Sequence, residues 1–198
     1  MLYFTSDPHL YHEKAVNFPE RKGLFTVDSW AEMFFDLVNS KVTKHDRLYI
    51  LGDFALGTHK YFMKARMALK PKDVWLCYGN HDGSKELCKR VFGERFRDTY
   101  ECKIKEMHCW LSHYPHLIWP KSHYGSFHLY GHLHHQRGEF WNQIPYLNDM
   151  RSLDVCPESY KFHFGEWGIF SEDQIYEILI KKKGHDDVLW YREQRGEL

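Results

Sequence analysis

The sequence lacks an excess of charge of either sign. Its 198 residues carry 27 Lys and Arg against 27 Asp and Glu. A protein that tracks long nucleic acid usually has a basic excess, so this balance argues against such a partner. The chain also shows no internal repeat, low-complexity tract or evident linker. Its length suits a single domain over residues 1–198 with a sizeable core.

Long apolar runs and patterned cysteines are missing as well. No run approaches the ~20 residues of a membrane-spanning helix, and the chain enters a strand pattern at Leu2 without the leader of a signal peptide. The five cysteines form no Cys-x-x-Cys pair, which favours reduced thiols over a disulfide framework. They are Cys77, Cys88, Cys102, Cys109 and Cys156. We therefore expect a cytoplasmic protein with no membrane partner.

Histidine and aromatic residues are abundant instead. The chain has 15 histidines, and Phe, Trp and Tyr make up 17% of it. Histidine is the commonest metal ligand in proteins, so this composition directs attention to metal chemistry. Several of these histidines directly follow predicted strands.

The first half of the sequence alternates between predicted strands and helices. Short apolar runs are typical of buried strands, and they occur at residues 2–5, 47–51 and 74–78. Apolar stripes at helical spacing predict the intervening helices, which cover residues 29–41, 58–69 and 84–92. We expect Asp28 or Ser29 to cap the first helix, Thr58 to cap the second and Gly93 to close the third. Residues 10–27 have the composition of a loop.

The second half of the sequence is mostly strand. Strands are predicted within residues 99–112, then at 127–130 and 152–155, with an irregular stretch over 135–150. Ser171 to Gln174 has the form of a capping box, which predicts a C-terminal helix to about Lys183 and a polar tail within residues 171–198. This order of elements indicates an α/β domain of two packed sheets with helices outside.

Polar side chains follow the predicted strands. Ligands bind at the carboxyl ends of strands in open α/β sheets, and these ends carry Asp7, His9, Asp53, Asn80, His81, His113, His132 and His134. Residues i and i+2 of an extended segment point the same way, so Asp7 with His9 can hold one metal. Carboxylate, amide and imidazole groups suit Mn, Fe, Zn or Ni. The set is too large for one four-coordinate ion and matches two ions that share a carboxylate.

These residues form five ordered blocks with a familiar pattern. The blocks are Asp7-Pro8-His9, Gly52-Asp53, Gly79-Asn80-His81-Asp82, His113 and Gly131-His132-Leu133-His134. The pattern resembles that of the calcineurin-like metallophosphoesterases, and Ser112-His113-Tyr114-Pro115 is similar to their small bacterial and phage-type members. The resemblance extends from Leu2 to about Val155, a motif core of residues 2–155. It implies a four-layer α/β/β/α sandwich of two mixed sheets.

The resemblance also implies a binuclear metal centre. One ion would be held by Asp7, His9, Asp53 and His134, and the other by Asp53, Asn80, His113 and His132. Asp53 would bridge the two divalent transition-metal ions, with Mn²⁺ expected first and Fe, Zn, Ni or Co as alternatives. A metal-bridging hydroxide would attack the phosphorus. His81 would not bind metal but would act as the acid for the leaving group or stabilise the transition state.

Two features depart from better-known branches of that family. The phosphoprotein phosphatases and diadenosine tetraphosphate hydrolases carry Gly-Asp-x-x-Asp-Arg-Gly, whereas residues 52–57 read Gly-Asp-Phe-Ala-Leu-Gly. The missing second Asp and Arg argue against those activities. Pro8 stands between two ligands, where it removes a backbone donor and should stiffen the loop.

The balance of these observations favours a phosphodiesterase acting on small nucleotide-like phosphoesters. Neutral charge, the missing phosphatase signature and an aromatic loop that could stack a nucleobase support it. That loop carries Tyr114, His116, Trp119 and His123, which could equally anchor it in the core. A phosphomonoesterase, a nuclease and a non-catalytic scaffold are the alternatives. The substrate, the metals and the oligomeric state stay open at this stage.

Several loop residues have two interpretations. We expect substrate contacts from Asn80, Arg21, His12 and Tyr114. Arg21 could hold a phosphate oxygen or be a solvated loop charge. Asp82 could take part in the chemistry or brace its turn by accepting backbone N–H groups.

Overall fold

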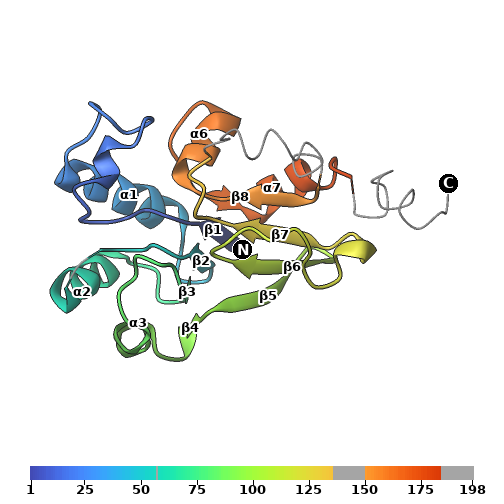
Figure 1. Ribbon diagram of the computed structural model, residues 1–198, viewed down its shortest axis with the longest axis horizontal. Coiled ribbons are helices and arrows are strands. Elements are labelled where there is room, and N and C mark those ends of the chain that lie inside the picture. The colour runs from blue at the N-terminus through green and yellow to red at the C-terminus, as the bar shows by residue number, and fades with distance from the viewer. Residues whose placement is uncertain (57, 136–149, 184–198) are drawn as a thin grey trace.

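Two mixed β-sheets packed face to face form the centre of the molecule (Figure 1). The computed structural model describes residues 1–56, 58–135 and 150–183. The first sheet has the order β4 (Phe96–Arg97), β3 (Val74–Cys77), β2 (Arg47–Leu51), β1 (Leu2–Thr5), β9 (Phe170–Ser171). The second has the order β5 (Thr99–Ile104), β6 (Met107–Ser112), β7 (Phe127–Tyr130), β8 (Ser152–Asp154). Two mixed sheets flanked by helices confirm the predicted α/β fold.

Strand direction decides where the strand ends meet. Strands β1 to β4 run parallel and β9 is antiparallel to β1. In the second sheet β6, β7 and β8 are parallel, and β5 forms an antiparallel hairpin with β6. The carboxyl ends of β1, β2 and β3 therefore share one edge of the first sheet, and those of β6 and β7 share an edge of the second.

Alternate residues of the central strands serve two different cores. In β2, Leu48 and Ile50 pack toward the helices, whereas Tyr49 and Leu51 pack toward the second sheet. Successive side chains of a strand point to opposite faces, so a sheet buried on both faces reads as a continuous apolar run. This arrangement explains why the parallel strands were visible in the sequence.

Helices flank the two sheets. They are α1 (Val27–Lys41), α2 (His59–Ala68), α3 (Lys85–Phe92), α6 (Pro157–Phe164) and α7 (Glu172–Leu179). Short 3₁₀ turns occur at Ala15–Asn17, Gly93–Arg95 and Ser122–Tyr124. Helices α1, α2 and α3 contribute to the core on the outer side of the first sheet, while α7 packs with the core between the sheets.

The helix ends agree with the sequence in part. The predicted cap of α1 is wrong, because Thr26 accepts the N–H of Ser29 and so starts the helix two residues earlier than the apolar stripe indicated. Ser84 and Gly93 do bound α3, and the capping box of Ser171 and Gln174 opens α7.

Helix α6 was not predicted from the sequence. It begins after Cys156, whose sulfur accepts the N–H of Ser159, and Pro157 occupies its first turn. Residues 136–149, which are most of the irregular stretch predicted over 135–150, and the tail over 185–198 lie outside the described residues. The five cysteines are free thiols, as expected.

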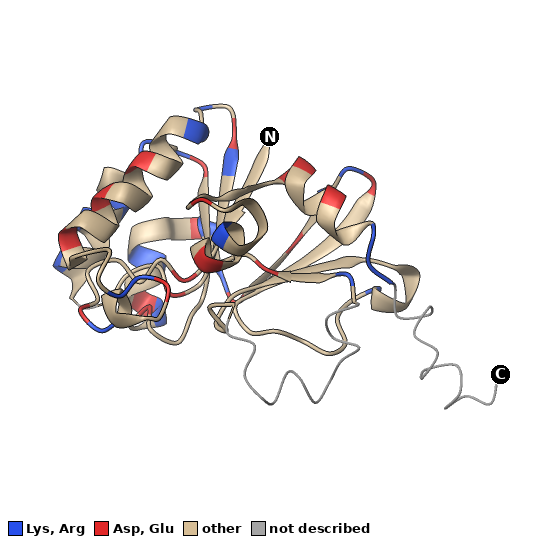
Figure 2. Ribbon diagram, turned by 90° about the horizontal axis from the view of Figure 1, so that it is seen from above, with Lys and Arg blue, Asp and Glu red and all other residues tan. Residues whose placement is uncertain are grey.

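Charge and length of the elements bear on possible partners. Figure 2 shows Lys and Arg interspersed with Asp and Glu over the described helices and loops. Among the described residues, no helix is both long enough and apolar enough to cross a membrane.

Candidate metal centre

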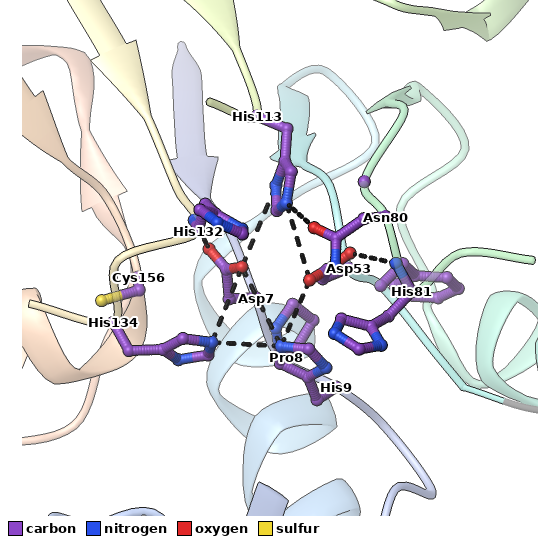
Figure 3. Close-up of polar contacts among 12 residues, drawn as sticks. Asp7, Pro8, His9, Asp53, Asn80, His81, His113, His132, His134 and Cys156 are labelled. Atoms are coloured by element: carbon purple, nitrogen blue, oxygen red, sulfur yellow. Dashed lines mark hydrogen bonds and ion pairs between the residues drawn. The ribbon is translucent and has the colours of Figure 1, made fainter. Parts of the chain in front are cut away.

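Polar side chains from both sheets converge where the strands end (Figure 3). The β1 and β2 ends supply Asp7, His9 and Asp53, and the turn after β3 supplies Asn80 and His81. The second sheet supplies His113 after β6, and His132 and His134 after β7. The structure thus brings together all the residues for which the sequence predicted metal binding or catalysis.

These side chains form two groups with the geometry of metal ligands. Asp7, His9 and His134 make one triad, and Asp53, His113 and His132 make the other, with each triad's ligand atoms within 4.8 Å of one another. Within the first triad, the Nε2 atoms of His9 and His134 lie 3.1 Å apart. Asp53 stands between the groups.

The position of Asp53 links the two triads. Its Oδ2 lies 3.4 Å from Nε2 of His9 and 3.6 Å from Nε2 of His113. Its other oxygen, Oδ1, accepts the backbone N–H of His81 at 2.7 Å. One carboxylate oxygen is therefore shared by the two groups while the other fixes the turn that carries His81.

The contacts of the His113 ring indicate a cation site beside its Nε2 atom. Its Nδ1 lies 2.9 Å from the Leu51 carbonyl oxygen, and its Nε2 lies 2.9 Å from Oδ1 of Asn80. Burial lowers the pKa of His113, so the ring is neutral and has a single N–H to donate. With that N–H donated to Leu51, the Nε2 lone pair faces the oxygens of Asn80 and Asp53. A cation between these three groups would satisfy them all.

Asp7 gives the same indication for the other triad. Its Oδ2 accepts the backbone N–H of His132 at 2.9 Å, but its buried Oδ1 has no hydrogen-bond partner in the part of the chain that the structure describes. That Oδ1 lies 3.8 Å from Nε2 of His134 and 3.9 Å from Nε2 of His9. Burial raises the pKa of Asp7 to about 8, which shows how poorly its charge is compensated by protein alone. The residues of both triads therefore fit divalent cations.

Most of the ligands have left-handed backbone conformations. The φ angles are 52° for Asp7, 46° for His9, 52° for Asp53, 70° for His132 and 49° for His134. Such angles are uncommon outside glycine and cluster at functional sites. They also correct a premise of the sequence argument: Asp7 and His9 converge through a strained turn and not through an extended segment. His132 and His134 belong to different triads.

The glycines of the motifs are required by space. A Cβ on Gly79 would lie 2.2 Å from the Asp53 nitrogen, and one on Gly131 would lie 2.2 Å from Oδ2 of Asp7. A Cβ on Gly52 would meet the His113 ring at 2.4 Å. Each glycine therefore makes room for a ligand that comes from another strand.

Asp82 stabilises the turns that carry the ligands. This bracing role is one of the two roles that the sequence allowed. It is buried, and its carboxylate accepts the backbone N–H groups of Asp53, Phe54 and Gly79 at 3.0, 2.7 and 2.8 Å. These bonds join the turn after β2 to the turn after β3. Asp82 therefore acts on the ligands through the backbone.

Comparison with known proteins agrees with the fold. No protein-family model matches the chain, and no curated protein matches it in sequence. Among solved structures, the AQ665 protein of Aquifex aeolicus, described as being of unknown function, has a TM-score of 0.66 at 23% identity and covers 90% of this chain and 98% of its own. An archaeal phosphodiesterase has a TM-score of 0.46 at 19% identity, covering 87% and 94%, respectively. The phosphoesterase YfcE of E. coli has a TM-score of 0.43 at 20% identity, and the match covers 79% of this chain and 78% of YfcE.

The similarity to AQ665 shows a shared fold along nearly the whole of both chains. This similarity concerns the fold alone, which is the α/β arrangement of two mixed sheets described above.

The rim of the site carries the predicted substrate contacts in part. Tyr114 is half exposed, and its ring centroid lies 4.6 Å from that of His132. The His12 ring lies 5.6 Å from that of His9 and 5.8 Å from that of His81. Sequence reasoning missed Phe18, whose ring lies 4.5 Å from that of His134. Phe18 falls in a loop without periodicity, so no local signal marked it.

The predicted contact of Arg21 with substrate is wrong. Arg21 was expected to hold a phosphate or to be solvated, but its side chain is fully buried and forms an ion pair with Glu158. Glu158 lies on the unpredicted helix α6, 137 residues away, so the sequence offered no means of finding the pair.

The aromatic loop after β6 is anchored in the protein. Trp119 is 4% exposed, and its indole N–H donates to Ser126. Its ring lies 5.2 Å from that of His128 on β7. For Trp119 the structure therefore selects the anchoring role over the stacking of a base.

Proposed function

We propose that this protein is a metal-dependent phosphoester hydrolase that uses two divalent cations. The observation that carries the proposal is the Asp53 carboxylate oxygen placed between His9 and His113, one from each triad. A shared carboxylate between two ligand groups is the arrangement needed to hold two ions close together. The motif resemblance to the calcineurin-like metallophosphoesterases supports the same conclusion.

The ligand residues would hold the metals, and their neighbours would handle the substrate. Two bound ions lower the pKa of a water molecule and compensate the charge of a phosphoryl group. His81 is fixed through its backbone N–H to Asp53, and its exposed side chain lies beside His9. From there the imidazole can donate a proton to the leaving oxygen, a contribution of ~10²–10⁴-fold in comparable enzymes. Asn80, His12 and Tyr114 line the rim from which a substrate would approach.

A phosphodiester is the favoured substrate. Arg21 is buried behind the site, so its guanidinium is not available to the second negative charge of a monoester. Aromatic rings of Phe18 and Tyr114 flank the two triads and suit an apolar or heterocyclic leaving group. Balanced charge fits a small substrate better than a long nucleic acid. Manganese is the first metal to test, because the mixed carboxylate, amide and imidazole set accepts it.

The alternatives differ in what they require. A nuclease would need a basic track for the backbone, and binding would fall steeply with salt. A non-catalytic scaffold would need a distorted or incomplete ligand set, whereas here the ligands of both triads converge. A phosphomonoesterase differs only in substrate preference and is separated by the assay below.

The decisive test is hydrolysis of a chromogenic phosphodiester and of the matching monoester with Mn²⁺. We expect turnover of the diester by the native chain and a loss of at least ~10³-fold in Asp53→Asn, because that change removes the shared charge. Asp98→Asn is the matched control and should retain activity, because Asp98 is an exposed residue whose carboxylate pairs with Lys85 at the surface. Monoester turnover alone would replace the diesterase assignment, and no turnover of either by the metal-loaded native chain would overturn the proposal.

A further inference from the structure

A buried ion pair stands directly behind the first triad. Arg21 from the loop before α1 and Glu158 from α6 are 0% and 2% exposed and form a direct ion pair. The Arg21 guanidinium also lies 4.0 Å from the centre of the Trp30 ring. A buried ion pair is weak evidence for stability, since apolar residues of similar volume often replace one without loss. The contacts of each partner therefore need a separate explanation.

Arg21 holds the backbone that carries two ligands. Its Nη2 donates to the carbonyl of Asp7 at 3.0 Å, and its Nη1 donates to the carbonyl of Pro8 at 3.3 Å. The indole of Trp30 donates to the same Pro8 carbonyl at 2.6 Å. These bonds grip the peptide units between Asp7 and His9, whose left-handed conformations need external support.

Glu158 faces the third ligand of the same triad. Its Oε2 lies 3.8 Å from Nδ1 of His134, and both atoms are buried with no hydrogen-bond partner among the described residues. The opposite nitrogen, Nε2, is the one that faces Asp7 and His9. A metal-binding histidine usually donates its second N–H to a carboxylate, which fixes the ring orientation and raises its basicity.

We propose that the Arg21–Glu158 pair positions all three ligands of the first triad, and so sets the affinity of that metal and not of the other. Arg21 acts through the Asp7–Pro8 backbone and Glu158 acts through His134. Neither is expected to touch substrate. The inference rests on the proposed metal centre but does not depend on which bond the protein hydrolyses.

Metal binding by the full chain tests this role without any assay of activity. Metal-free native protein is titrated with Co²⁺, followed by calorimetry and by the visible absorption of the bound ion, beside the double variant Arg21→Met/Glu158→Leu. We expect two ions in the native protein. In the variant we expect one ion of native affinity and one weakened by roughly 10–100-fold, the usual effect of losing such a supporting group. Arg47→Met/Asp73→Asn removes an ion pair at the opposite end of β2 and serves as control.

The outcomes separate positioning from a merely structural role. A folded double variant that binds both ions as the native chain does, or that loses affinity equally at both, would overturn the inference. If the double variant lacks the native circular dichroism spectrum, Glu158→Gln makes the same selective prediction with the pair's shape retained. Selective weakening in a protein that hydrolyses no phosphoester would retain this inference and reject the proposed function. A double variant that binds both ions with native affinity, in a protein that does hydrolyse a phosphoester, would reject this inference and retain the proposed function.

Discussion

At the scale of single residues, the site depends on backbone positions that tolerate little change. Asp7, His9, Asp53, His132 and His134 all have φ between 46° and 70°. Conformations of this kind cost about 1–3 kcal/mol each and persist only where the surroundings enforce them. The glycines of the motifs supply part of that enforcement by letting ligands from neighbouring strands approach closely.

Gly79→Ala tests this requirement for space. The added Cβ would lie 2.2 Å from the backbone nitrogen of Asp53 and 2.3 Å from its Oδ1, so one of the two turns must move. We expect a loss of about 1–3 kcal/mol in the free energy of unfolding, typical of overpacking, and weaker binding of Mn²⁺ by calorimetry. Gly165→Ala is the reference for backbone strain without crowding, because Gly165 has a φ of 78° and no described atom lies within 4 Å of an added Cβ, so it should lose stability but bind Mn²⁺ as the native chain does. Binding of two ions by Gly79→Ala with native affinity would contradict the argument.

At the scale of elements, Asp82 ties the end of β2 to the end of β3 through three backbone N–H groups. Asp82→Asn replaces one acceptor oxygen by an amide NH₂ that faces N–H donors. We expect the free energy of unfolding in urea to fall by about 1–3 kcal/mol, the cost of unsatisfied buried groups. Metal affinity should fall with it, because the Asp53 turn loosens. The exposed Asp98→Asn provides the baseline, and equal stability of the two variants would refute the bracing role.

His128 links β7 to the loop that follows β6 and makes this contact sensitive to acid. Its Nε2 accepts the N–H of His116 at 3.1 Å while its Nδ1 lies 3.2 Å from the Trp110 carbonyl, a pattern that only the neutral ring satisfies. Burial lowers the pKa of His128 to about 3. The folded pKa lies below the unfolded value of 6.5, so this stabilisation is present above 6.5 and is lost as the pH falls from there toward 3.

His128→Gln should therefore flatten the loss of stability in acid. We expect the native, metal-free chain to lose up to about 1.4 kcal/mol more per pH unit than the variant below the unfolded pKa. Urea unfolding of both proteins between about pH 7 and about pH 5 measures the difference. His45→Gln, at an exposed position, should follow the native profile. Parallel profiles for His128→Gln and the native chain would show that His128 does not titrate in this range.

At the scale of the whole molecule, the candidate ligand groups join the two sheets. Asp7 and His9 come from the first sheet and His134 from the second, and the other triad combines Asp53 with His113 and His132 in the same way. Bound cations would compensate the buried carboxylates at the line where the sheets meet. Metal binding should therefore contribute to the stability of the entire fold.

Chelation should lower the melting temperature of the native chain. A ligand present at about 1,000 times its Kd stabilises a protein by about 4 kcal/mol, so the melting temperature should rise again with the concentration of added Mn²⁺. Scanning calorimetry of chelated and reloaded protein measures this dependence. Asp53→Asn should respond less, because the shared ligand has lost its charge. A melting temperature that does not change with the Mn²⁺ concentration would argue against two bound cations.

Much of the fold was predictable because its signals are local. The parallel strands β1, β2 and β3 appear as continuous apolar runs since both faces are buried, and α3 and α7 carry their own caps. The first residue of α1 was predicted wrongly because the capping residue, Thr26, lies outside the apolar stripe that marked the helix. Helix α6 was missed because a short helix with buried polar residues such as Glu158 and Ser159 lacks a clear apolar stripe.

The sequence by itself determined the strand–helix order of the first half of the chain, the identity of the candidate ligands and their position at strand ends, because apolar runs and motif spacing are properties of neighbouring residues. Only the tertiary structure brings these residues together in space. His9 meets His134 across 125 residues, and Arg21 meets Glu158 across 137. Contacts over such separations depend on how two sheets pack, and the charge of Arg21 looks the same in a sequence whether it faces solvent or a buried carboxylate.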